Sequence, residues 1–184
     1  MRALRQGELD ALCGIYALIN AMEIAGVTGP RSNLHRSLFA KLTRGLPYDR
    51  LQSAMHHGLD AEDLMSTGTR AFRWLRRSHG TKLSLSQPMR ANENEDLSTF
   101  IDTVRAWTEQ PDLAVIVNLH LPGLSHWTVV RRIRSQVMEV RDSSGLKTLE
   151  LDRFSLTKGR FRFSANETLL VRSSVATDRT RRSR

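Results

Sequence analysis

The sequence predicts an α+β fold in which helices occupy the first part of the chain and strands the second. Up to about residue 110, apolar residues recur every three or four positions, which is the period of a helix packed on one face. From Leu113 onward, short apolar runs rich in β-branched residues alternate with polar turns, as in an antiparallel sheet. We therefore expect a helical lobe packed on a sheet.

Five helices are expected in the first part of the chain, and each has a recognisable start or end. Gly26, Gly45, Gly58 and Gly80 each follow an apolar periodic segment, and glycine is the usual residue just beyond a helix. Asp60 is placed to cap the longest of these helices, because side-chain oxygens at that position accept from free backbone N–H groups. The predicted helices cover 12–25, 33–43, 47–57, 60–80 and 96–109.

The strands are predicted from apolar, β-branched composition. The run after Pro111 reads Leu-Ala-Val-Ile-Val-Asn-Leu, which is typical of a strand buried on both faces. A second strand begins at His126, and a polar turn around Arg134 and Ser135 separates it from a third that ends at Asp142. The predicted strands cover 81–87, 113–119, 126–130, 137–142, 158–163 and 168–172.

Length and charge indicate one domain with a basic tail. A chain of 184 residues is long enough to bury one continuous core. The last segment, 173–184, lacks apolar periodicity and is rich in arginine, so we predict a domain over 1–172 followed by a disordered tail. The formal net charge of +9 would attract polyanions, but nucleic-acid binding is predicted on non-specific charge alone.

Composition also limits the cellular setting and the chemistry. No apolar run approaches the roughly 20 residues that a membrane span needs, and we recognise no conventional signal peptide. A single cysteine cannot form an internal disulfide, so a reducing, cytoplasmic setting is expected. We find no zinc-ligand spacing, helix-turn-helix or glycine-rich phosphate loop, and no cofactor or metal is predicted. The sequence leaves the oligomeric state open.

That single cysteine, Cys13, lies immediately before an apolar helical stretch, in the segment Asp-Ala-Leu-Cys-Gly. The positive end of the helix dipole and the free backbone N–H groups of the first turn stabilise a thiolate. Although a lone cysteine can equally be a small buried apolar residue, its position predicts a nucleophile.

A base and an orienting carboxylate are available on the predicted strands. His126 begins one strand, and Asp142 ends the next. Because adjacent antiparallel strands bring the start of one beside the end of the other, a contact between this imidazole and this carboxylate is expected. A nucleophile, a base and a group that orients the base make up the usual machinery of nucleophilic catalysis.

With a cysteine at a helix start and His and Asp on successive strands, the chain resembles the papain-like cysteine peptidase superfamily. Within it, the Cys-Gly opening and the His-Trp-Thr-Val-Val strand are similar to those of the bacteriocin-leader-processing peptidases of bacterial exporters and related small bacterial thiol peptidases. The resemblance implies a papain-like fold, with the cysteine on a helical lobe and the histidine and aspartate on the sheet. It further implies that Cys13 is the nucleophile, His126 the general base and acid, Asp142 the orienting group and Gln6 a donor to the oxyanion.

The expected activity is then hydrolysis of a peptide or isopeptide bond through a thioester, with a peptide or protein as substrate. Two alternatives remain open: a transamidase or translocated effector that uses the same triad, and a peptidase-like module that binds a peptide or polyanion without cleaving it. All the catalytic readings require the sulfur to be accessible in a cleft between the lobes and close to the imidazole.

Overall fold

The computed structural model describes residues 6, 10–27, 33–89 and 96–174. This part of the chain has an α+β fold, as predicted, with five α-helices and a six-stranded antiparallel sheet. The helices are α1 (Cys13–Ile24), α2 (Asn33–Arg44), α3 (Tyr48–His57), α4 (Ala61–His79) and α5 (Leu97–Thr108). The strands are β1 (Leu83–Ser86), β2 (Leu113–Leu121), β3 (Leu124–Arg134), β4 (Val137–Arg141), β5 (Thr148–Glu150) and β6 (Arg162–Ser173).

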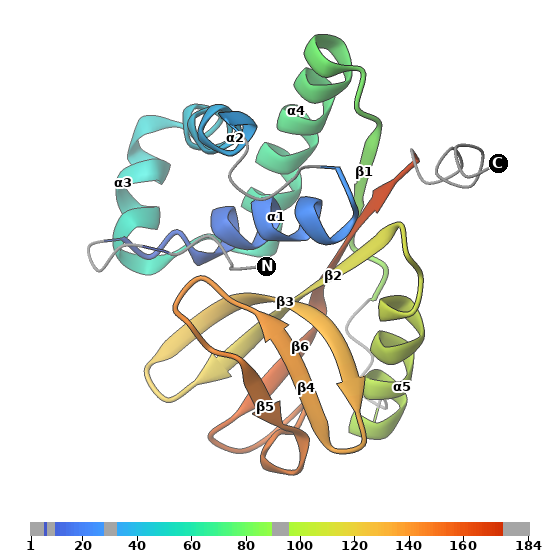
Figure 1. The fold of residues 1–184 in the computed structure, drawn as a ribbon. Coiled ribbons are helices and arrows are strands. Elements are labelled where there is room, and N and C mark those ends of the chain that lie inside the picture. The colour runs from blue at the N-terminus through green and yellow to red at the C-terminus, as the bar shows by residue number, and fades with distance from the viewer. Residues whose placement is uncertain (1–5, 7–9, 28–32, 90–95, 175–184) are drawn as a thin grey trace, which may run out of the picture.

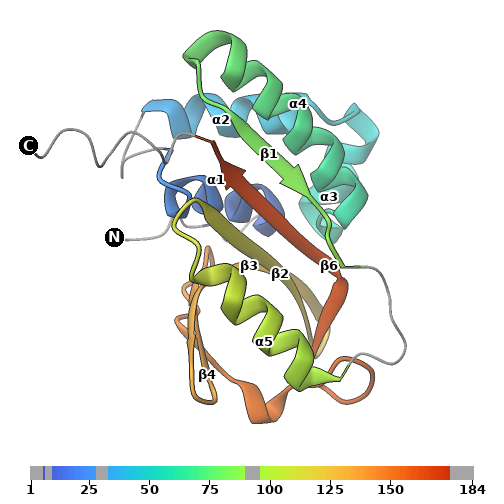
Figure 2. The same ribbon diagram turned by 90° about the vertical axis from the view of Figure 1, so that its right-hand side faces the viewer.

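The sheet has the strand order β1-β6-β2-β3-β4-β5, and helices cover both of its faces. Figure 1 shows α1 lying on the sheet, with α2, α3 and α4 farther out on the same side. The fifth helix, α5, packs against β2 and β3 from the other face (Figure 2). The cysteine-bearing helix therefore lies between the central strands and α2, whereas α4 also packs directly on the edge strand β1.

The central strand β2 contributes to two separate cores. Its residues Ala114 and Ile116 pack with α1 and the helical lobe, whereas Val115 and Val117 pack with α5 on the opposite face. Successive side chains of a strand point to opposite faces, so a strand with two covered faces must be apolar throughout. This arrangement explains the uninterrupted apolar run that predicted the strand.

The predicted helix boundaries are supported by the observed caps. The Asp60 side chain accepts a hydrogen bond from the Asp63 backbone N–H at 2.8 Å, and α4 begins at the next residue. The same helix ends at Gly80, which has φ +65°, a conformation that glycine adopts without steric cost. Asp96 caps α5 in the same way, through the Thr99 N–H at 2.8 Å.

The strand prediction was wrong in two places. The segments 158–163 and 168–172 were expected as two strands, but residues 158–161 form bends, and 162–163 and 168–172 lie in one strand, β6, which runs from Arg162 to Ser173. The polar pair Asn166-Glu167 breaks the apolar run, but the Asn118 amide of β2 donates to the Glu167 carboxylate at 3.0 Å. The short edge strand β5 was not predicted at all.

The last described strand extends into the range predicted for the tail. Ser173 still belongs to β6, inside the range predicted for the tail, and residues 175–184 lie outside the described residues.

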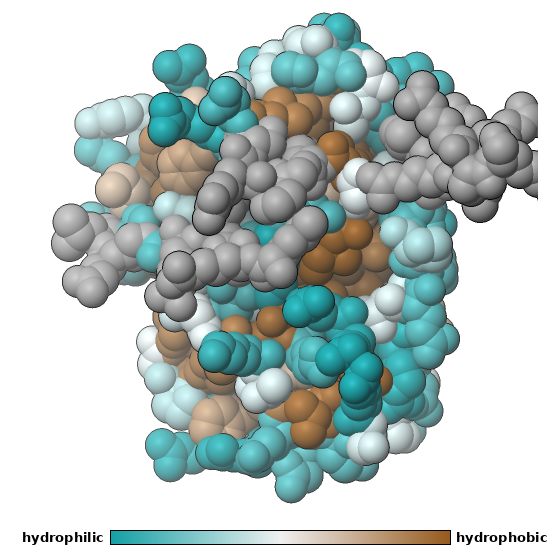
Figure 3. Space-filling view, in the orientation of Figure 1, coloured by the Kyte–Doolittle hydropathy of each residue, from teal (hydrophilic) through white to brown (hydrophobic). Residues whose placement is uncertain are grey.

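Among the helices that the structure describes, none is both long and apolar enough to cross a membrane. Hydrophilic residues surround the outer end of α4 in the space-filling view (Figure 3).

Candidate active site

Cys13 is the first residue of α1, as the sequence predicted. The chain enters the helix through an Asx turn, in which the Leu12 N–H donates to the Asp10 carboxylate at 3.1 Å. The next residue must be small, because a Cβ atom on Gly14 would lie 2.8 Å from Leu64 Cδ2 of α4. Close packing of the first turn of α1 against α4 therefore fixes the position of the cysteine.

His126 and Asp142 are brought together by the pairing of β3 with β4. The two strands run antiparallel through a tight turn in which Ser135 has φ +47°. His126 Nε2 lies 2.6 Å from Asp142 Oδ2, and both side chains are buried. The contact predicted from the strand spacing is present.

The Asp142 carboxylate is held by the loop that follows it. Its second oxygen, Oδ1, accepts hydrogen bonds from the backbone N–H groups of Ser144, Gly145 and Leu146 at 2.8, 3.1 and 3.2 Å. Burial alone would raise the pKa of Asp142, but the hydrogen bond and charge of His126 and the Ser144 hydroxyl lower it to about 2. The carboxylate is therefore ionised and fixed in orientation.

The Cys13 sulfur lies against the start of β3. The Trp127 backbone N–H donates to Sγ at 3.5 Å. Burial would lower the pKa of His126, but hydrogen bonds to Asp142 and Cys13, together with their negative charges, raise it to about 10. Because Nε2 of the imidazole is occupied by Asp142, Nδ1 is the nitrogen left for the thiol. The carboxylate is thus bonded to the imidazole, and the sulfur lies at the start of the strand that carries this imidazole.

The indole of Trp127 is a structural part of this site. Only 2% of the residue is exposed, and its ring N–H donates to the Leu59 carbonyl at 2.8 Å. The ring also packs close to Gly14, because a Cβ atom added to this glycine would lie 3.2 Å from Trp127 Cδ1. Trp127 thus joins α1, β3 and the segment before α4.

Gln6 lies between the segment that contains Asp142 and the segment that contains Cys13. Its backbone N–H donates to the Ser143 carbonyl at 3.0 Å, and its side-chain oxygen accepts from the Ser143 hydroxyl at 3.3 Å. Its side-chain nitrogen donates to the Asp10 carbonyl. Gln6 therefore contacts the residue that follows Asp142 and the turn that leads to Cys13.

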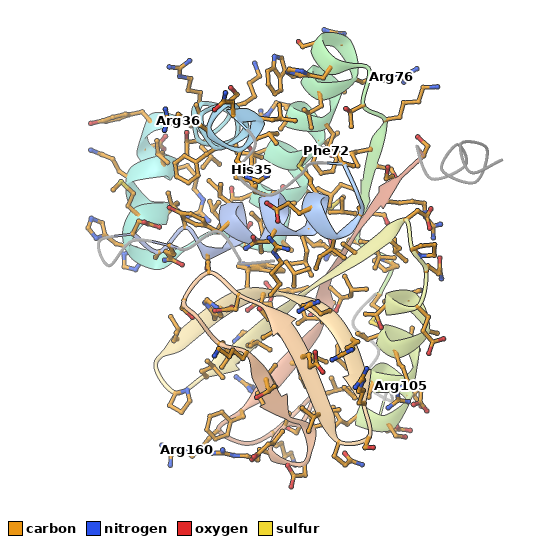
Figure 4. The ribbon with its side chains drawn as sticks, in the orientation of Figure 1. His35, Arg36, Phe72, Arg76, Arg105 and Arg160 are labelled. Carbon is orange, nitrogen blue, oxygen red and sulfur yellow. The ribbon has the colours of Figure 1, made fainter. Side chains whose placement is uncertain are left out.

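A buried polar cluster behind the site was not predicted. Arg141 of β4 is ion-paired with Glu23 of α1, and its Nε donates to the Asn20 side chain at 3.3 Å. The other oxygen of Glu23 lies 3.0 Å from Nε2 of His35, which lies between α2 and α1 in Figure 4. Burial lowers the pKa of both His35 and Arg141. The signal that could have revealed this cluster is the presence of Asn20 and Glu23 inside an otherwise apolar helix.

The site differs from the predicted open cleft in one respect. Only 4% of Cys13, 5% of His126 and 3% of Asp142 is exposed. The sulfur lies beside the start of β3, at the Trp127 backbone N–H, but it is far less accessible than the sequence-based hypothesis required.

No family model matches the chain, and no curated protein matches it in sequence.

Proposed function

We propose that this chain is a papain-like cysteine hydrolase that cleaves a peptide or isopeptide bond through a thioester on Cys13. One observation carries the proposal: the imidazole of His126 is bonded to the Asp142 carboxylate, and the neighbouring Cys13 also raises the pKa of this histidine. A buried structural cysteine has no need of a histidine whose pKa is raised to about 10 by an oriented carboxylate. The order of the three groups is that of a nucleophile, a base and an orienting residue.

In the first half of the reaction, the Cys13 thiolate attacks the carbonyl carbon of the scissile amide and forms a carbon–sulfur bond. The first N–H groups of a helix have no partner within the helix, so the Cys13 N–H is available to the resulting oxyanion. Gln6 supplies the second donor in this proposal, through the side-chain N–H that does not bond to Asp10. His126 then protonates the leaving amine as the carbon–nitrogen bond breaks.

In the second half, water attacks the thioester and His126 accepts its proton. The carbon–sulfur bond breaks, the acid product leaves, and the thiolate–imidazolium pair is restored. Because only 4% of Cys13 is exposed, turnover requires the groups that cover the sulfur to move when substrate binds. General acid–base catalysis of this type contributes about 10²–10⁴-fold.

The burial of Cys13 favours one other candidate function, a peptidase-like module that binds a peptide without cleaving it. The two functions differ in the reactivity of the thiol, since a binding module needs none. An amine-acceptor reaction, transamidation, uses the same thioester and differs only in the second step.

The test is profiling with a peptide library that carries a thiol-reactive electrophile, read out by intact-mass spectrometry. We expect covalent labelling of the wild type with a defined sequence preference and none of Cys13→Ala. The preferred peptides, made as amides, should be hydrolysed. Peptides that bind without labelling or cleavage would instead identify the binding module, and amine conjugates would identify the transamidase.

A further inference from the structure

A basic cleft lies in the helical lobe, between the outer faces of α2 and α4. Its volume is about 920 Å³, within the range of small-molecule sites. The residues that line the cleft come from α2, α4 and Gly45, and none of them belongs to α1, β3 or β4. Its lining residues are Ser37, Ala40, Lys41, Arg44, Gly45, Arg70, Arg73, Trp74, Arg77 and Ser78.

The cleft concentrates positive charge without any compensating acid. Five of its lining residues are cationic, all five are exposed, and none of the lining residues is acidic. On α4, Arg70, Arg73 and Arg77 follow the helical spacing that places like charges beside one another, which is unfavourable for the helix itself. Within the described part of the chain, none of the five forms an ion pair with a carboxylate.

Helix ends account for only part of this charge. The C-terminus of a helix carries the equivalent of about half a negative charge, so α2 and α4 together supply about one. Arg70 has a local role, because its guanidinium donates to the Gly45 carbonyl at 2.6 Å just beyond α2. Arg73 lies before the last turn of α4, where the dipole has little effect. Arg36 and Arg76 project from the same two helices in Figure 4 and extend the positive surface beyond the cleft.

Trp74 distinguishes the ligand class. A half-buried indole lines the cleft among the guanidinium groups. Arginine forks match phosphate oxygens in two-pronged hydrogen bonds, and an aromatic ring offers a stacking surface to a base. A cationic groove with one aromatic residue is the combination that binds nucleotides in single strands. An acidic peptide without aromatic side chains would use the charges but not the ring, which within the chain meets the ring of His79 edge-on at 5.1 Å between centroids.

We propose that this cleft binds nucleotide units, with their phosphates held by the cationic side chains of α2 and α4 and a base stacked on Trp74. The ligand is either a free nucleoside triphosphate or a segment of single-stranded nucleic acid, since the two present the same chemistry. This replaces non-specific charge, the only basis that the sequence offered, with a defined site.

The test is fluorescence anisotropy with two probes, a labelled 12-nucleotide single-stranded RNA and a labelled ATP, at several salt concentrations. Unlabelled ATP, inorganic tripolyphosphate and a hexaglutamate peptide serve as competitors. We expect the RNA, ATP or both to bind. Each nucleotide ligand that binds should do so with higher affinity than tripolyphosphate and hexaglutamate. Arg73→Gln/Arg77→Gln should weaken binding at least tenfold and reduce its salt dependence, because two phosphate contacts are lost. Trp74→Leu should weaken it about tenfold.

The matched control is Arg131→Gln/Arg134→Gln, which removes the same charge from two exposed positions of β3 and should change affinity less than twofold. Lys41→Gln/Arg44→Gln on α2 provides a second disruption if the α4 variant does not fold. Equal losses in the α4 variant and the β3 control, an unchanged affinity in Trp74→Leu, competition by tripolyphosphate or hexaglutamate equal to that of ATP, or no binding of either nucleotide probe at 50 mM salt would each overturn the proposal.

Discussion

The guanidinium of Arg141 is ion-paired with the carboxylate of Glu23, and both side chains are buried. Glu23 belongs to the helix that begins at Cys13, and Arg141 directly precedes Asp142. This contact therefore ties the thiol-bearing helix to the strand that ends at the orienting carboxylate. It fixes the position of Cys13 on α1 relative to Asp142 at the end of β4.

Removal of one partner of this ion pair should destabilise the protein strongly. Glu23→Gln leaves Arg141 buried without its carboxylate and also alters the contact with His35, at a cost of about 3–5 kcal/mol in the free energy of unfolding. The measurement is urea denaturation. The double variant Glu23→Leu/Arg141→Met should recover part of the loss, since both charges are then absent. A double variant that loses the sum of the two single effects would show that the pair is not the cause.

Loss of the imidazole should reduce turnover strongly. His126→Ala removes the proton donor to the leaving amine, so kcat should fall by about 10²–10⁴-fold on a substrate selected from the library. His120→Ala is the matched control, because this histidine lies in the adjacent strand β2, is 37% exposed and contacts only Glu167 among the ion pairs of the described residues. Equal losses of kcat in the two variants would argue against a catalytic His126.

The pH dependence of turnover should follow the raised pKa of His126. The imidazolium is the required acid, so activity should persist through neutral pH and fall as pH rises through about 10. Asp142→Asn removes the hydrogen-bonded negative charge, and its basic limb should move toward the ordinary histidine value of about 6.5. A wild-type limb already near 6.5 would show that the carboxylate does not raise this pKa.

The stability of the protein should respond to pH through the same pair. The folded-state pKa of His126 lies above its ordinary 6.5, so its contribution is complete below pH 6.5 and is lost as pH rises through about 10. The pKa of Asp142 lies below its ordinary 3.8, so its contribution is complete above that value and is lost as pH falls through about 2. Thermal melts of the wild type and the double variant His126→Gln/Asp142→Asn should therefore diverge between these limits. Parallel curves would contradict the linkage.

Trp127 should prove structural rather than catalytic. Trp127→Phe leaves the Leu59 carbonyl without its donor, which should cost about 1–3 kcal/mol of stability. The backbone N–H that donates to the Cys13 sulfur is unchanged by this substitution, so turnover should stay within a fewfold of the wild type. Urea denaturation and steady-state kinetics on the same preparation separate the two effects.

Local features of the sequence were sufficient for the helices and for the contact between His126 and Asp142. The signals are short-range: a glycine just after a helix, an aspartate that caps a helix start, and a polar turn between two strands. The antiparallel pairing of the two strands follows from that turn. Contacts distant in sequence were not predictable, such as Glu23 with Arg141 or Asn118 with Glu167, because no local pattern selects the partner. The second of these keeps β6 continuous through a polar pair, where composition predicted a break.

The accessibility of Cys13 was also beyond the sequence. A cysteine at a helix start can face a cleft or the interior, and the outcome depends on how closely the helix approaches its neighbours. Here Gly14 allows close contact with Leu64 and Trp127, and the cysteine is covered.

The most direct test of the central claim is the rate at which iodoacetamide alkylates Cys13 at pH 7 in the wild type and in His126→Ala. Steric access predicts faster alkylation in the variant, because removing a buried ring beside the sulfur opens space around it. Loss of the imidazolium predicts slower alkylation, because this cation stabilises the thiolate that reacts with iodoacetamide. We predict alkylation at least tenfold slower in His126→Ala than in the wild type, and an equal or faster rate in the variant would contradict the proposed pairing of Cys13 with His126.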